Sequence, residues 1–200
     1  MSRMRGAMKE AFTAVLGGCL LGGCLIGINP LGYSLETVAV ASQEKVATTN
    51  WQEVKSKPGK CSMSFPSNAE HVTETMKIDE DGTELKYDAY ISATENDSVF
   101  MLLIAQYPDF VDDSFAQMSL EAFLNGILSQ GSGSQLLFAD LVLVHGHEGL
   151  DFFIKTGANY FKARVVMVKS KLYLMAMECK VSDYNESHYD RFVNSFLLNH

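Results

Sequence analysis

One short segment concentrates side chains that could bind a metal ion. His145, His147 and Glu148 lie within four consecutive residues, with Gly146 between the two histidines. If a strand continued through this segment, the two imidazoles would project from the same face, and Glu148 would add a carboxylate. Zinc sites use three or four such ligands, so a further ligand would have to come from another element. A solvated turn explains the same residues, and we predict neither a resident metal nor a cofactor.

Other motifs that could support catalysis are incomplete. Residues 79–82 (Asp-Glu-Asp-Gly) resemble the start of a calcium loop, but the twelfth position of that loop is Tyr90, which offers no carboxylate. Residues 129–134 are rich in glycine and serine, yet they follow a predicted helix and contain no lysine, whereas phosphate-binding loops precede a helix. The sequence therefore favours a non-catalytic protein.

Four cysteines divide between two parts of the chain. Cys19 and Cys24 lie in an apolar N-terminal run, whereas Cys61 and Cys179 lie in strand-like segments of the main domain. In an oxidising compartment Cys61 and Cys179 could form a disulfide. Their methionine-rich and aliphatic neighbours favour two buried free thiols instead, and the sequence leaves both states open.

The N-terminal segment, residues 1–28, has the features of a bacterial export signal. Three basic residues precede an uncharged apolar run from Ala11 to Ile28. Basic residues stay on the cytoplasmic side of such a run, so we expect the following domain to lie outside the cytoplasmic membrane. Leu21-Gly22-Gly23-Cys24 resembles the lipobox of bacterial lipoproteins and makes Cys24 the expected lipidation site, with Cys19 as the alternative.

Other fates of this segment stay open. Its apolar run would span about 27 Å as a helix, enough for an uncleaved membrane anchor. Ordinary signal cleavage could follow Ala39-Val40-Ala41, and a buried cytoplasmic helix is the least favoured alternative. Residues 29–49 begin with Asn-Pro and end in small and polar residues, which predicts a flexible spacer before a domain at residues 50–200.

The charge of the main domain restricts its partners. After Ala41 the chain carries 13 basic and 22 acidic residues, a net charge of −9. Such an excess of negative charge argues against nucleic acid, and against anionic lipid as a partner of the domain surface. Contact with a membrane is expected through the N-terminal segment alone.

The patterning of the domain predicts an α+β fold built on an antiparallel sheet. Short turns separate most of its strand-like runs, which lie at residues 51–55, 60–65, 70–78, 84–92, 99–106, 135–144, 150–156, 160–168 and 172–181. Short links join antiparallel neighbours, because a parallel crossover needs a dozen or more residues. Residues 99–106 are almost continuously apolar, which predicts a central strand buried on both faces.

Two amphipathic helices are expected against the faces of this single sheet. The first has Ser119 as its expected N-cap and an apolar face formed by Leu120, Phe123, Leu124, Ile127 and Leu128. The second begins near Asp183, and its apolar face is formed by Tyr189, Phe192, Val193 and Phe196.

Several short patterns resemble those of PsbP-like and DcrB-like domains. Gly59-x-Cys61-x-Met63-x-Phe65-Pro66 resembles their opening strand, with Cys61 in place of an aromatic residue. Gly146-x-x-Gly149, the strand with Arg164 and the closing run 192–196 (Phe-Val-Asn-Ser-Phe) follow in the family's order, so the resemblance covers residues 50–198. It implies a PsbP-like α-β-α sandwich in an exported protein, often a lipoprotein, that acts as an accessory or binding module.

We therefore predict a membrane-tethered domain of the bacterial cell envelope that binds a protein or a small ligand and catalyses no reaction. The alternative is a metal-dependent envelope hydrolase that uses His145, His147 and Glu148. The sequence identifies neither the partner nor the ligand.

Overall fold

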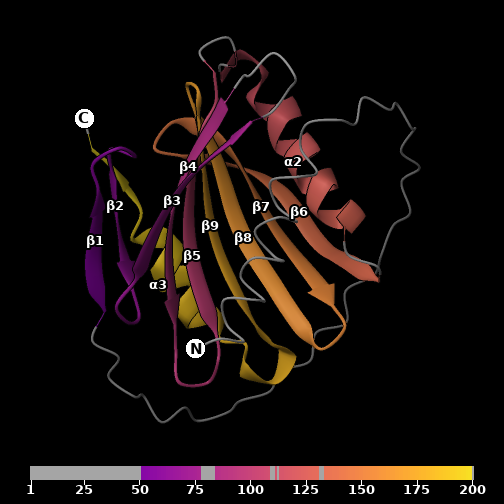
Figure 1. Cartoon of the computed structure of the whole chain (residues 1–200). Helices are drawn as coiled ribbons and strands as arrows, with labels where there is room; N and C mark the ends of the chain where they lie inside the picture. Colours follow the sequence, from indigo (N-terminus) through magenta and orange to yellow (C-terminus); the bar gives the residue numbers. More distant parts are fainter. Residues whose placement is uncertain (1–50, 78–83, 109–110, 112, 131–132, 200) are drawn as a thin grey trace.

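The computed structural model describes residues 51–77, 84–108, 111, 113–130 and 133–199 (Figure 1). The N-terminal segment with Cys19 and Cys24, the spacer and the calcium-loop-like residues 79–82 lie outside these ranges. Among the described residues, no helix has both the length and the apolar character that a membrane crossing requires.

The strands of the described residues form two antiparallel sheets. The large sheet has seven strands in the order β3-β4-β5-β9-β8-β7-β6, and the small sheet has three in the order β1-β2-β10. The large sheet consists of β3 (Glu70–Lys77), β4 (Glu84–Ala93), β5 (Val99–Gln106), β6 (Ser134–Val144), β7 (His147–Thr156), β8 (Asn159–Val168) and β9 (Lys171–Lys180). The small sheet consists of β1 (Gln52–Ser56), β2 (Cys61–Phe65) and β10 (Leu197–Leu198).

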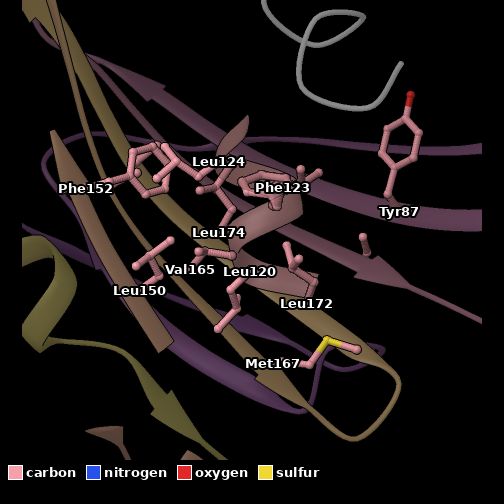
Figure 2. Close-up of a cluster of buried hydrophobic side chains, with 14 of the residues drawn as sticks. Tyr87, Leu120, Phe123, Leu124, Leu150, Phe152, Val165, Met167, Leu172 and Leu174 are labelled. Carbon is pink, nitrogen blue, oxygen red and sulfur yellow. The ribbon is translucent and has the colours of Figure 1, made fainter. Parts of the chain in front are cut away.

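The large sheet is covered on both faces. Helix α2 (Ala116–Gln130) packs on one face, where Leu120, Phe123 and Leu124 meet apolar side chains of β7, β8 and β9 (Figure 2). Helix α3 (Glu186–Asn194) and the small sheet pack on the opposite face. We refer to these two faces as the α2 face and the α3 face.

The expectation of a single sheet is wrong, because β2 pairs with the C-terminal strand β10 and not with the large sheet. Leu197 and Leu198 lie opposite Ser62 and Cys61. A two-residue strand has no periodicity to recognise, and its partner is distant in the sequence. The other expectation for the sheet is confirmed: β5 is a central strand that sends Leu103 to the α2 face and Leu102 to the α3 face.

Both helices begin at residues other than those expected. Helix α2 starts at Ala116, so Ser119 is inside the helix and is not its N-cap. Ala116 is buried, one turn before Leu120, and thus extends the apolar face toward the N-terminus. Helix α3 starts at Glu186, and the Asn185 side chain accepts a hydrogen bond from the backbone N–H of His188, which is the usual role of an N-cap.

Candidate binding surface

The residues considered for a metal site do not converge. His145 and Gly146 form the two-residue turn between β6 and β7, with φ of 51° and 83°. The His145 Nε2 atom lies 2.9 Å from the carbonyl oxygen of Phe196, to which it donates. His147 and Glu148 are consecutive residues of β7, so their side chains point to opposite faces. Across the described ranges, no group of three or more His, Cys, Asp and Glu side chains could hold a metal ion.

The turn is shorter than the sequence suggested, because β7 already begins at His147. Gly149 is therefore a strand residue, and its role is close packing. A Cβ atom at Gly149 would lie 2.9 Å from the carbonyl oxygen of Val165 on the neighbouring strand. Gly146, by contrast, supplies the positive φ that a two-residue hairpin turn requires.

Cys61 and Cys179 are both buried free thiols in this structure. Cys61 lies in β2 and Cys179 near the end of β9, within the apolar cluster of the α3 face. Burial raises the pKa of the Cys61 thiol to about 12 and that of Cys179 to about 11. Both thiols lack the solvent access of a reactive cysteine.

We expect both thiols to resist alkylation in the folded protein, because the raised pKa depletes the thiolate and burial blocks the reagent. Iodoacetamide treatment of the full chain at about pH 8, near the pKa of a free thiol, should label Cys61 and Cys179 slowly before denaturation and completely after it. Peptide mass analysis measures the labelling. Fast labelling of the folded chain would contradict this expectation. An unreduced mass lower by about two hydrogens would instead reveal a disulfide.

The neighbouring rings Phe152 and Phe153 lie on opposite faces of β7. Phe152 is buried under α2, near Phe161. Phe153 lies on the α3 face, with its ring centroid 4.8 Å from that of Tyr160 and 5.1 Å from that of Tyr184. This second ring belongs to an aromatic cluster that surrounds a lysine.

Lys162 of β8 is the centre of that cluster and is only 8% exposed. Its ammonium group donates to the Tyr184 hydroxyl at 3.1 Å and pairs with the Glu186 carboxylate. It also lies 4.5 Å from the ring centroid of Tyr189 and 5.5 Å from that of Phe153, within the range of cation–π attraction. These contacts attach the start of α3 to β7 and β8.

A second ion pair lies beside the first on the same face. Arg164 donates from Nε and Nη2 to the two carboxylate oxygens of Asp151, at 2.7 Å each. The Tyr189 hydroxyl is buried and has no hydrogen-bond partner among the described residues. Burial raises the pKa of that hydroxyl, and the nearby Asp151 carboxylate adds to the effect. The two cationic side chains beside Tyr189 are each paired with a carboxylate of the protein, Lys162 with Glu186 and Arg164 with Asp151.

Sequence reasoning missed this cluster. Lys162 and Arg164 alternate with Phe161, Ala163 and Val165, a pattern that usually marks a solvent-facing strand surface. The available signal was the density of aromatic residues around both positions, but it does not say which rings meet the lysine.

The Glu186–Lys162 pair predicts a pH dependence of stability. Burial opposes ionisation of Glu186, but hydrogen bonds from Lys162 and Tyr184 outweigh it and lower the pKa of the carboxyl below 4.5. A folded-state pKa below the unfolded one stabilises the fold above the unfolded pKa, and this contribution disappears as the pH falls through the folded value. We expect Glu186→Gln to lower the free energy of unfolding near neutral pH, with a difference that shrinks in acid.

Urea denaturation of the wild type and Glu186→Gln, from about pH 7 down to about pH 3, measures this difference across the range in which a carboxyl group titrates. Glu95→Gln is the matched control, because Glu95 is exposed in a turn. A Glu186→Gln effect that is constant over this pH range would contradict the argument.

The edge strand β6 carries the most unusual surface of the domain. Four of the eight exposed large hydrophobic side chains among the described residues belong to it, namely Leu136, Leu137, Leu141 and Leu143. Its single charged residue is Asp140. The opposite edge strand β3 has the sequence EHVTETMK, with acidic and basic residues along its length. Charged side chains are a common protection of edge strands, so β3 has this protection and β6 lacks most of it.

Three comparisons relate the chain to known proteins. A scan against models of protein families finds no match, and a search of curated proteins finds none either. Among solved structures, the chain is similar to PsbP (CyanoP) of the cyanobacterium Synechocystis sp. PCC 6803. The two share 16% identity over 79% of this chain and 98% of the other, with a TM-score of 0.46. A PsbP-like domain is also what the sequence patterns resemble.

A second similar structure is PA94 of Pseudomonas aeruginosa, a protein of unknown function. Its identity to this chain is 11% over 66% of this chain and 85% of the other, with a TM-score of 0.33. The described residues themselves form a sheet-dominated antiparallel domain with two α-helices.

Proposed function

We propose that the chain is a membrane-tethered domain of the bacterial cell envelope that binds a protein partner along the edge strand β6 and catalyses no reaction. The observation that carries this proposal is the exposure of Leu136, Leu137, Leu141 and Leu143 on one edge strand. Contiguous exposed apolar residues are typical of interaction sites. A strand edge also offers backbone donors and acceptors to an added strand.

The paired charges on the α3 face support the same proposal. Lys162 pairs with Glu186 and Arg164 with Asp151, so these groups are engaged with each other and hold the fold together. The alternative of a metal-dependent hydrolase would need His145, His147 and Glu148 to bind one metal ion together with a further ligand from another element. Metal titration of the purified chain tests that alternative directly.

The proposed tether is tested by lipid labelling of cells that express the full chain. A labelled fatty acid should enter the wild type and be lost in Cys24→Ala, while Cys19→Ala keeps the label. Loss of the label in Cys19→Ala alone would identify Cys19 as the lipidation site. Absence of the label in the wild type would favour the other two fates, an uncleaved membrane anchor or ordinary signal cleavage. A single acyl chain gives marginal membrane binding, so stable attachment needs more than one.

The binding surface is tested by placing a photoreactive amino acid at position 143 of the full chain in intact envelopes. Leu143 is 77% exposed, so the replacement should leave the fold intact. We expect an adduct of defined mass from position 143, and none from the matched position Thr75 on the other edge strand. Leu141→Lys in the same chain should abolish the adduct. No adduct from position 143 would refute β6 as the binding surface.

A further inference from the structure

We propose that the occupant of the β6 edge is a second copy of this chain, joined by antiparallel β6–β6 pairing about a two-fold axis at Leu141. This inference rests on the proposed function, because it identifies the partner of the same edge. The pairing would join two seven-stranded sheets into one continuous sheet.

The hairpin geometry determines which backbone groups of β6 are open to a partner. Val144 and His147 flank a two-residue turn and are directly paired, so they form the hydrogen-bonded pair that closes the hairpin. Hydrogen-bonded and non-hydrogen-bonded pairs alternate along an antiparallel ladder. The N–H and C=O groups of Ala139, Leu141 and Leu143 therefore point away from β7, toward the open edge.

The side chains of the same three residues share one face. Leu141 and Ala139 lie opposite Leu150 and Phe152 of β7, which are buried under α2, so they belong to the α2 face. Leu141 is 56% exposed and Leu143 is 77% exposed. The residues with open backbone groups thus also present the apolar surface that a partner strand could cover.

The sequence of β6 is complementary to itself around Leu141. An axis there pairs Leu141 with Leu141 of the second copy, and Ala139 with Leu143, on the α2 face. On the α3 face it pairs Phe138 with Val144 and Asp140 with Val142. Each copy contributes one carboxylate, and it lies opposite an aliphatic residue. Like charges directly opposite each other, which destabilise a sheet, are thereby avoided.

Three other registers, with axes at Asp140, Ala139 and Leu143, are less favourable. An axis at Asp140 would place the two carboxylates directly opposite each other. An axis at Ala139 would run the ladder into the bulge at Leu137, where the register with β7 shifts. An axis at Leu143 would run it into the turn at His145. Leu141 is the centre of the regular segment 138–144.

The two copies also repel each other, because each domain carries a net charge of −9 after Ala41. Salt screens this repulsion over a distance of about 8 Å at physiological ionic strength. Pairing through apolar side chains and backbone hydrogen bonds does not depend on attraction between charges. We therefore expect the dimer to strengthen when salt is raised from about 20 to about 300 mM, because the screening length shortens over that range.

Cysteine crosslinking of the full chain in native membranes tests the register. Directly opposite residues in hydrogen-bonded pairs have Cα atoms about 5.5 Å apart, within the range of a disulfide. Leu141→Cys should form a disulfide-linked dimer after mild oxidation. In the same dimer, the two cysteines introduced by Leu143→Cys would lie roughly 14 Å apart along the strands. This variant should therefore crosslink at least about ten times less than Leu141→Cys. Thr75→Cys on β3 is the control, and the unsubstituted chain sets the background of the native cysteines.

The solution mass of the full chain in mild detergent tests the dimer without crosslinking. The wild type should have twice the chain mass, and Leu141→Lys should weaken dimerisation at least tenfold. Its unfolding transition should equal that of the wild type at concentrations where both chains are monomeric. A monomeric wild type at all concentrations, or equal crosslinking of Leu141→Cys and Leu143→Cys, would overturn the inference. A photo-adduct at position 143 with a mass other than twice the chain would also overturn it, yet would support the proposed function. Absence of any adduct would overturn both.

Discussion

Replacing Phe192 by alanine is expected to cost about 3–5 kcal/mol of unfolding free energy. The ring is fully buried on α3, and its centroid lies 5.2 Å from those of Phe65 and Phe100, in edge-to-face orientation. Phe65 belongs to the small sheet and Phe100 to the large one. Truncation would therefore leave a cavity at the point where α3 joins both sheets.

Urea or guanidinium denaturation of the full chain measures this cost. Phe115→Ala is the matched control, because Phe115 is 62% exposed and its truncation should change stability by less than about 0.5 kcal/mol. A loss below about 1 kcal/mol for Phe192→Ala would mean that α3 does not pack against the two sheets as described.

Phe152→Ala should have an effect of the same size, about 3–5 kcal/mol, on the other face of the large sheet. The Phe152 ring is fully buried in the cluster under α2, with Leu124 and Leu150 (Figure 2). Loss of this ring removes contacts between β7 and α2. Thermal and chemical denaturation should both report the lower stability.

Phe153→Ala provides a matched comparison one residue away. Phe153 is half-buried on the α3 face, so its truncation should cost less than half as much as that of Phe152. Part of its cost would come from the lost cation–π contact with Lys162. Equal losses for the two substitutions would contradict the different burial of the two rings.

Local patterns in the sequence were sufficient to locate most strands. The alternation in residues 84–92 and the apolar run 99–106 correspond to β4 and β5, because period-two patterning reflects which side chains face a core. Short links correctly predicted antiparallel neighbours. The apolar face of α3 is confirmed for Tyr189, Phe192 and Val193, but the helix ends at Asn194, so Phe196 is buried beyond it and is not part of that face.

The candidate binding surface was not predictable in the same way. Hydrophobicity alone would place β6 in the interior, since it contains Leu, Val, Phe and Ala at most positions. Its exposure follows from its place in the sheet. After α2 the chain forms β6 at the edge of the large sheet opposite β3. Strands β7, β8 and β9 then add one after another toward the centre, where β9 pairs with β5. That long-range pairing makes β6 an edge strand.

Nine of the ten described strands, their antiparallel connections and most of the two apolar helix faces follow from local sequence patterns, because each depends on residues close together in the chain. Three features emerge only in the folded chain: β10 completes a second sheet, Lys162 is buried among aromatic rings, and β6 lies at the edge of the large sheet. These features depend on contacts between distant segments. Burial of a charge or exposure of an apolar strand is a property of the surroundings, which a local pattern does not contain.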